Sequence, residues 1–97
     1  MSLNIRLKPK AYEDMAHIYQ YSLKEFGPTK AGQYIEALDD TFRKLADNSA
    51  IGIDYSEIKP GIMACLSASH IVFFRRSKNH LTIIRVLYQS MDFIRHL

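Results

Sequence analysis

The sequence predicts a single α+β domain in which an antiparallel sheet carries a helical hairpin on one face. Three observations predict it. Apolar residues alternate near the N-terminus, recur at three- and four-residue steps from about residue 10 to residue 47, and alternate again in three runs after residue 61. The predicted order is β-α-α-β-β-β, and 97 residues with 47% hydrophobic content suit one core spanning 1–97.

The first strand and the first helix follow from a change of period. Leu3, Ile5 and Leu7 alternate with polar residues, and Pro9 ends the strand. From about residue 10 the apolar residues recur at helical spacing, so we expect them to form one stripe that faces the core. The members of this stripe are Tyr12, Met15, Ala16, Tyr19, Leu23 and Phe26.

Gly27-Pro28 ends the first helix, and a second helix is expected from about Thr29 to Asp47. Its apolar stripe consists of Ala31, Tyr34, Ile35, Leu38, Phe42 and Leu45. Because the connection is so short, the two helices must pack as an antiparallel hairpin. Residues 48–60 are expected to be an irregular connector that ends at the turn Pro60-Gly61.

Three strands are expected after this turn, at about 62–67, 70–76 and 81–89. Ser77-Lys78-Asn79 suits a tight turn, which makes the last two strands an antiparallel hairpin. In the last strand Thr82, Ile84, Val86 and Tyr88 point one way, while Leu81, Ile83, Arg85 and Leu87 point the other.

Both faces of this final hairpin are apolar, and the chain has only one helical hairpin to cover them. Burying one large apolar side chain gains roughly 1.5–3 kcal/mol, and exposed apolar patches usually mark an interface. We therefore expect a partner on the second face, an amphipathic and net acidic peptide. The alternative is that residues 91–97 or a second copy of the chain cover it.

The charge distribution supports an anionic partner. Residues 1–58 carry seven Lys/Arg and nine Asp/Glu, a net −2, whereas residues 59–97 carry six Lys/Arg and Asp92 alone, a net +5. The alternative is a basic domain that binds nothing through its charge. Cys65 is the only cysteine, and the sequence has no metal-ligand or phosphate-loop spacing, no leader and no membrane-spanning run. We expect a cytoplasmic protein without cofactor or metal.

Several segments together resemble the ParE-type toxins of bacterial toxin–antitoxin modules, in the RelE/ParE superfamily. The segments are Phe26-Gly27, residues 48–52, residues 58–62, residues 69–75 and residues 84–92. The resemblance implies the same β-α-α-β-β-β fold and a small ParD-like antitoxin that wraps and neutralises the toxin. It also implies a non-catalytic inhibitor of DNA gyrase, in a module that often stabilises plasmids.

The alternative within the superfamily is a RelE-type, ribosome-dependent mRNA endonuclease. That chemistry needs a base, cations and an acid around one phosphate. Arg75, Arg85 and Tyr88 are its candidates, with His70 or His80 as base. Arg85 and Tyr88 lie three apart on a strand, so they point to opposite faces unless a bulge intervenes. We therefore favour a binding module over a nuclease, and a nuclease over a plain nucleic-acid-binding domain, because no aromatic stacking platform is evident.

Two sets of binding residues are predicted. The antitoxin is expected to contact the final hairpin through Ile71, Phe73, Arg75, Ile83, Arg85 and Leu87. Arg95 and Asp92 are the candidates for target binding. A homodimer or a heterotetramer with the antitoxin is the expected assembly. Tyr88 is expected in the core if it faces the helices, and His70 is expected to be an ordinary hydrogen-bonded or surface imidazole.

Overall fold

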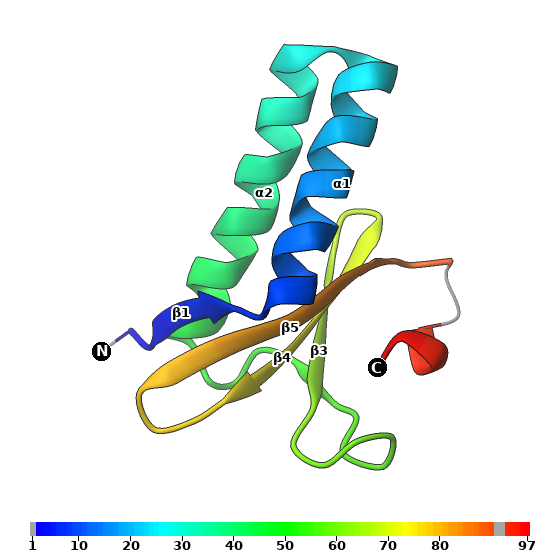
Figure 1. Ribbon diagram of the computed structural model, residues 1–97. Helices are drawn as coiled ribbons and strands as arrows, with labels where there is room; N and C mark the ends of the chain where they lie inside the picture. Colours follow the sequence, from blue (N-terminus) through cyan, green and yellow to red (C-terminus); the bar gives the residue numbers. More distant parts are fainter. Residues whose placement is uncertain (1, 91–92) are drawn as a thin grey trace.

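The computed structural model describes residues 2–90 and 93–97 and confirms an α+β fold with a helical hairpin on a sheet (Figure 1). In chain order the elements are β1 (Asn4–Leu7), α1 (Pro9–Phe26), α2 (Pro28–Asp47), β2 (Ile53–Asp54), β3 (Met63–Ser67), β4 (His70–Arg76), β5 (His80–Tyr88) and the 3₁₀ turn η1 (Phe93–His96). No helix among these residues is long and apolar enough to cross a membrane.

The five strands form one sheet in the order β1-β5-β4-β3-β2. β3, β4 and β5 are antiparallel neighbours, as predicted, whereas β1 runs parallel to β5 after the crossover through the helical hairpin. The connector expected to be irregular contains β2, which pairs with Ala64 and Met63 of β3. A strand of two residues is too short to show alternation, so the sequence pattern did not reveal it.

The main core lies between the sheet and α2. The sheet contributes Val72, Phe74, Leu81, Ile83 and Val86, and α2 contributes Leu38, Phe42, Leu45 and Ala46. Ala11 is the fully buried residue that α1 adds to this cluster. The prediction that the stripe of α2 faces the core is therefore confirmed.

The prediction for α1 was wrong about which face is buried. Ala11 and Ser22 are buried and Met15 and Ile18 pack against the core, whereas four large members of the predicted stripe are exposed. The exposed four are Tyr12 (64%), Tyr19 (40%), Leu23 (39%) and Phe26 (60%). The buried face of α1 thus carries Met15 and Ile18 between Ala11 and Ser22, and the two small side chains allow the helix to approach its neighbours closely.

A β-bulge breaks the alternation of β5. Phe73 pairs with Arg85 but Phe74 pairs with Ile83, so Ile84 is an extra residue in β5. Leu81, Ile83 and Val86 consequently all belong to the helix-side core, which the predicted alternation had divided between the two faces. A bulge moves every later side chain to the opposite face, and the apolar pattern alone does not disclose it.

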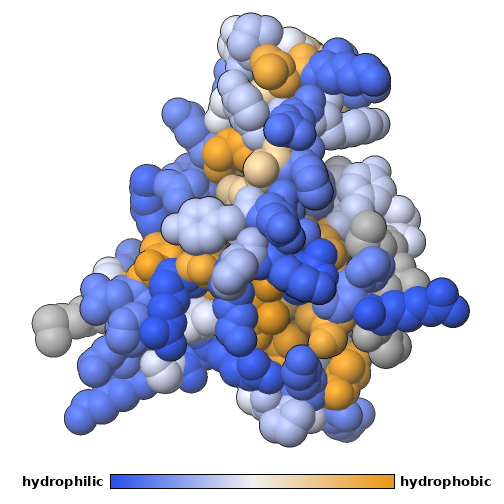
Figure 2. Space-filling model, in the orientation of Figure 1, coloured by the Kyte–Doolittle hydropathy of each residue, from blue (hydrophilic) through white to orange (hydrophobic). Residues whose placement is uncertain are grey.

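The second face of the sheet carries a smaller apolar cluster. Ile62, Ala64, Phe73 and Leu87 are buried there, with Tyr55, Ile71, Ile84 and Leu97 packed against them. The C-terminal residue Leu97 supplies part of this cover, as the alternative prediction proposed, and Tyr55 of the connector supplies another part that was not predicted. Lys59 Nζ donates to the Leu97 carbonyl oxygen at 3.0 Å, and Arg85 donates to that of His96 at 3.1 Å. Figure 2 shows apolar side chains still visible at the surface in the lower part of the molecule.

Candidate partner-binding groove

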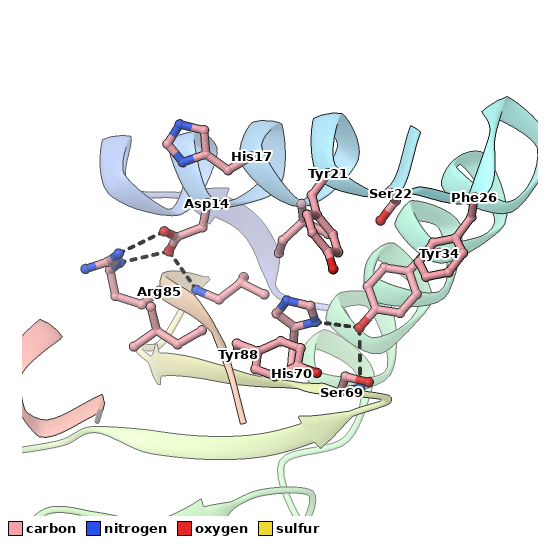
Figure 3. A pocket seen from close by; sticks show the side chains of 13 residues that line it. Asp14, His17, Tyr21, Ser22, Phe26, Tyr34, Ser69, His70, Arg85 and Tyr88 are labelled. Carbon is pink, nitrogen blue, oxygen red and sulfur yellow. Dashed lines mark hydrogen bonds and ion pairs between the residues drawn. The ribbon is translucent and has the colours of Figure 1, made fainter. Parts of the chain in front are cut away.

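A groove of about 760 Å³ opens between α1, the first half of α2 and the paired ends of β4 and β5 (Figure 3). We call it the aromatic groove. Most of its residues come from one side of α1, from the start of β4 and from the C-terminal end of β5. It is lined by Asp14, His17, Ile18, Tyr21, Ser22, Phe26, Tyr34, Ser69, His70, Arg85, Val86, Leu87 and Tyr88.

Aromatic side chains dominate the rim of the groove. Tyr21, Phe26 and Tyr88 are 63%, 60% and 50% exposed, although each carries a large apolar ring. Aromatic rings gain most from burial and also offer hydroxyl groups for orientation. The volume lies in the range of ligand-binding clefts, so the groove suits an apolar ligand or partner side chains with a few polar groups.

One end of the groove is closed by an ion pair between α1 and β5. Arg85 Nε and Nη2 each donate to a carboxylate oxygen of Asp14 at 2.8 Å, and the two side chains are only 14% and 11% exposed. Asp14 Oδ2 also accepts the backbone N–H of Val86 at 2.9 Å. β1 ends at Leu7, opposite Ile83, so Asp14 satisfies a donor on the β5 edge that β1 no longer covers. The hydrogen bond to Asp14 raises the pKa of Arg85.

A second polar group occupies the other end. The Tyr34 hydroxyl forms a short hydrogen bond with Nδ1 of His70 and accepts the backbone N–H of Ser69 at 3.3 Å. The His70 ring also lies edge-on to the ring of Tyr88, with centroids 5.4 Å apart. Burial lowers the pKa of His70. The expectation of a hydrogen-bonded imidazole at this position is confirmed.

The six residues predicted to bind an antitoxin do not share one face. Phe73 and Leu87 are buried in the second cluster with Ile71 packed beside them, but Ile83 is fully buried on the helix side. The bulge at Ile84 explains why Ile83 was assigned to the wrong face. Of the two arginines, Arg75 donates to the Pro60 carbonyl oxygen at 3.1 Å, while Arg85 is bound by Asp14. Antitoxin binding by these residues stays a prediction.

The candidate nuclease residues are only partly brought together, although Arg85 and Tyr88, which were expected on opposite faces of a strand, both line the aromatic groove. Tyr88 and His70 lie side by side in the aromatic groove, Arg85 lies at the groove's other end, and Arg75 contacts the connector. His80 begins β5 opposite Asn4, away from this groove. Tyr88 pairs with His70 and is half exposed, so the expectation that it belongs to the core was wrong.

The residues predicted to bind the target lie at the C-terminal end. Arg95 is an exposed residue of η1, and Asp92 lies outside the described residues. No three His, Cys, Asp or Glu side chains within 2–90 and 93–97 are grouped so that they could hold a metal ion.

Sequence reasoning missed Asp14, Tyr21 and Tyr34 as members of the site. A signal for the first two was present, because Asp14, Ile18 and Tyr21 follow helical spacing along the flank of the buried stripe. Tyr34 was assigned to the apolar stripe of the second helix, where its hydroxyl gave no separate signal. The partners of Asp14 lie more than 70 residues away, at Arg85 and Val86, so only the tertiary fold brings them together.

Comparison with known proteins identifies the family. Residues 5–93 match the family described as "ParE toxin of type II toxin-antitoxin system, parDE". The chain is 35% identical over 92 residues to "Toxin ParE1" of Caulobacter vibrioides, covering 95% of each protein. It is 32% identical over 98 residues to "Toxin ParE1" of Mycobacterium tuberculosis, covering 100% of each.

The fold has a solved counterpart. The structure described as "Chromosomal ParDE TA system from P. aeruginosa" superposes with a TM-score of 0.76 at 19% identity, covering 90% of this chain and 96% of that one. At 19% identity this superposition shows a shared fold only. The family assignment rests on the sequence matches. The chain therefore belongs to the ParE toxin family of type II toxin–antitoxin systems.

Proposed function

We propose that this toxin acts in the cytoplasm by binding and inhibiting DNA gyrase, without cutting RNA, and that a ParD-like antitoxin neutralises it. The main support for a toxin that does not cleave RNA is that its candidate arginines are already bound by groups within the chain. RNA cleavage needs cations free to face a phosphate as negative charge develops. Among the described residues that line the aromatic groove, the one arginine is Arg85, and Asp14 holds it in a bidentate pair.

The remaining candidates do not restore such a site. Arg75 donates to the Pro60 carbonyl and lies outside the groove lining, so it adds no positive charge near His70 and Tyr88. The described residues that line the groove thus carry Asp14 and Arg85 as a neutral pair, next to aromatic and hydroxyl groups. This composition suits an apolar protein segment better than the phosphate backbone of RNA.

Neutralisation is proposed to use the final hairpin and the aromatic groove that borders it. Arg85 and Leu87 belong to both the predicted antitoxin set and the groove lining, which makes them the link between the two surfaces. The net charge of +3 favours an acidic partner segment. A heterotetramer of two toxins and two antitoxins is the assembly we propose, and Arg95 in η1 with Asp92 remains the proposed contact to gyrase.

The test is a pair of assays on purified toxin. One measures DNA supercoiling by gyrase, and the other measures cleavage of mRNA on translating ribosomes. We expect supercoiling to fall with toxin concentration while the mRNA remains intact. Adding a stoichiometric amount of the antitoxin encoded beside the toxin should restore supercoiling.

Matched variants locate the target contact. Arg95→Ala is expected to weaken inhibition of supercoiling, whereas Arg43→Ala, on the exposed face of α2, should leave it unchanged. Cut mRNA together with undisturbed supercoiling would overturn the proposal and favour the RelE-type alternative.

A further inference from the structure

We propose that the aromatic groove contains a carboxylate-binding subsite at Nε2 of His70, which receives an Asp or Glu side chain of an acidic peptide partner. The inference rests on the proposed function only for the identity of that partner, the antitoxin segment. The subsite itself follows from how Tyr34, Ser69 and Tyr88 hold the imidazole ring.

The hydrogen bonds around Tyr34 favour one tautomer of His70. The Ser69 backbone N–H can only donate, so the Tyr34 oxygen accepts from it. Donation from the Tyr34 hydroxyl to Nδ1 of His70 is the arrangement that also gives the hydroxyl proton an acceptor within the described chain, and we assign it to this pair. A neutral imidazole that accepts at Nδ1 carries its own proton on Nε2. His70 therefore presents an N–H donor from the opposite edge of its ring.

The ring has little freedom to turn this donor elsewhere. Tyr34 lies against it on one side and Tyr88 on the other, each with centroids 5.4 Å from that of His70 and at steep interplanar angles of 65° and 86°. His70 lines the groove, and within the described part of the chain Nε2 has no hydrogen-bond acceptor. Figure 3 shows the His70 ring beneath α1, with Tyr21 on the opposite wall. The donor is thus fixed before any ligand arrives.

The charges that surround the ring do not oppose an anionic acceptor, and the hydrogen bond itself favours one. α1 presents Asp14, His17 and Tyr21 to the groove, α2 presents Tyr34, and β5 presents Arg85 and Tyr88. Among the described residues of this lining Asp14 is the one carboxylate, and both of its oxygens are occupied by Arg85 and Val86. The subsite is therefore close to neutral, and the chain as a whole is at +3. A hydrogen bond to a carboxylate is about twice as strong as one to a neutral oxygen.

The aromatic rings around His70 determine which groups the ligand should carry next to its carboxylate. Tyr21, Phe26 and Tyr88 leave large apolar surfaces open beside the donor. The preferred group is a carboxylate on a short apolar or aromatic stem, which is what an acidic residue next to a large apolar residue presents on an amphipathic helix. A simple chemical mimic of this arrangement is 3-phenylpropionate.

The experiment uses nuclear magnetic resonance of the full chain with ¹⁵N-labelled histidine. Titration with 3-phenylpropionate is expected to shift the Nε2 and Hε1 signals of His70 to saturation. The uncharged 3-phenylpropanol, which has the same ring and stem, should bind at least about tenfold more weakly, because it lacks a charge-assisted hydrogen bond worth roughly 1.5–3 kcal/mol. Equal affinity for the two compounds, or an unshifted His70 signal at saturation, would overturn the proposal.

Variants separate the subsite from the groove. His70→Gln should remove the preference for the carboxylate, and Tyr34→Phe should weaken it because that tautomer is no longer favoured. His80→Gln changes a histidine at the start of β5, which is not in the groove lining, and should leave the preference intact. The titration of the unaltered chain decides the proposal even if a variant folds poorly. It requires neither gyrase nor antitoxin, so failure here and failure of the proposed function are separate results.

Discussion

The three arginines of β4 and β5 are each bound by an acceptor inside the chain. Arg76 donates to the carbonyl oxygens of Leu45, Asn48 and Ile51, where α2 ends and the connector begins. Arg75 donates to Pro60, and Arg85 joins Asp14 to the His96 carbonyl. These three positive charges therefore stabilise the fold through hydrogen bonds within the chain.

The Asp14–Arg85 pair should contribute strongly to stability. Asp14→Asn leaves an almost buried guanidinium without its counter-charge, and removing one partner of such a pair is costly. We expect the free energy of unfolding to fall by about 2–3 kcal/mol, measured by urea denaturation. Asp40→Asn, in an exposed pair with Arg43, is the control and should change it by less than about 0.5 kcal/mol. Similar losses in both variants would contradict this role.

His70 should make the stability depend on pH. Burial lowers its pKa in the folded chain, so near the ordinary value of about 6.5 the unfolded chain binds more protons. The free energy of unfolding is therefore expected to decrease as the pH falls through that value. Denaturation of the native chain and of His70→Gln between pH 5.5 and 7.5 should show a weaker slope in the variant. An identical slope in the two proteins would argue against a buried, neutral His70.

At the scale of elements, spacing alone predicted both helices and the three long strands to within about two residues. Gly27-Pro28, Pro60-Gly61 and the alternation of β4 mark these bounds, because turn chemistry and period are local properties. The faces were harder to predict. α1 has two adjacent apolar stripes, and its approach to α2 and the sheet buries the one with Ala11 and Ser22.

The aromatic groove results from two features that the sequence pattern did not reveal, the buried face of α1 and the bulge in β5. Tyr21 and Phe26 remain at its rim because the small-residue face of α1 is the buried one. The bulge at Ile84 sets which side chains of β5 face the groove beyond it, and a bulge leaves no trace in the apolar pattern. Predicting the partners of Asp14 and His70 would have required the tertiary fold.

The connector adopts a backbone conformation at Gly52 that favours glycine. Its φ is +123°, and an added Cβ would lie 2.8 Å from Cζ of the buried Phe74. Gly52→Ala is expected to lower the free energy of unfolding by about 2 kcal/mol through backbone strain and this clash. Gly32→Ala is the matched control, because Gly32 lies within α2 with nothing within 4 Å of its added Cβ. That change should instead raise stability by about 1 kcal/mol, and thermal unfolding measures both.

For the whole molecule, the chain covers more of the second face of the sheet than the sequence predicted, because Phe73 and Leu87 are buried by residues of the same chain. Tyr55 of the connector and Leu97 pack against Phe73 and Leu87, and the aromatic groove lies elsewhere, beside α1. Length and composition set the amount of apolar surface, but they could not determine which segment folds over it. The family was recognisable from the sequence, whereas the place of the groove was not.

The central claim is that this toxin binds its target and performs no chemistry on RNA. The most direct test is the inhibition of gyrase supercoiling by Tyr88→Phe, which removes only a hydroxyl from a half-exposed groove residue. We expect the concentration for half-inhibition to stay within about twofold of the native value, because no proton transfer depends on that hydroxyl. The contradictory result is a native toxin that leaves supercoiling intact and cleaves ribosome-bound mRNA, with the cleavage lost in Tyr88→Phe.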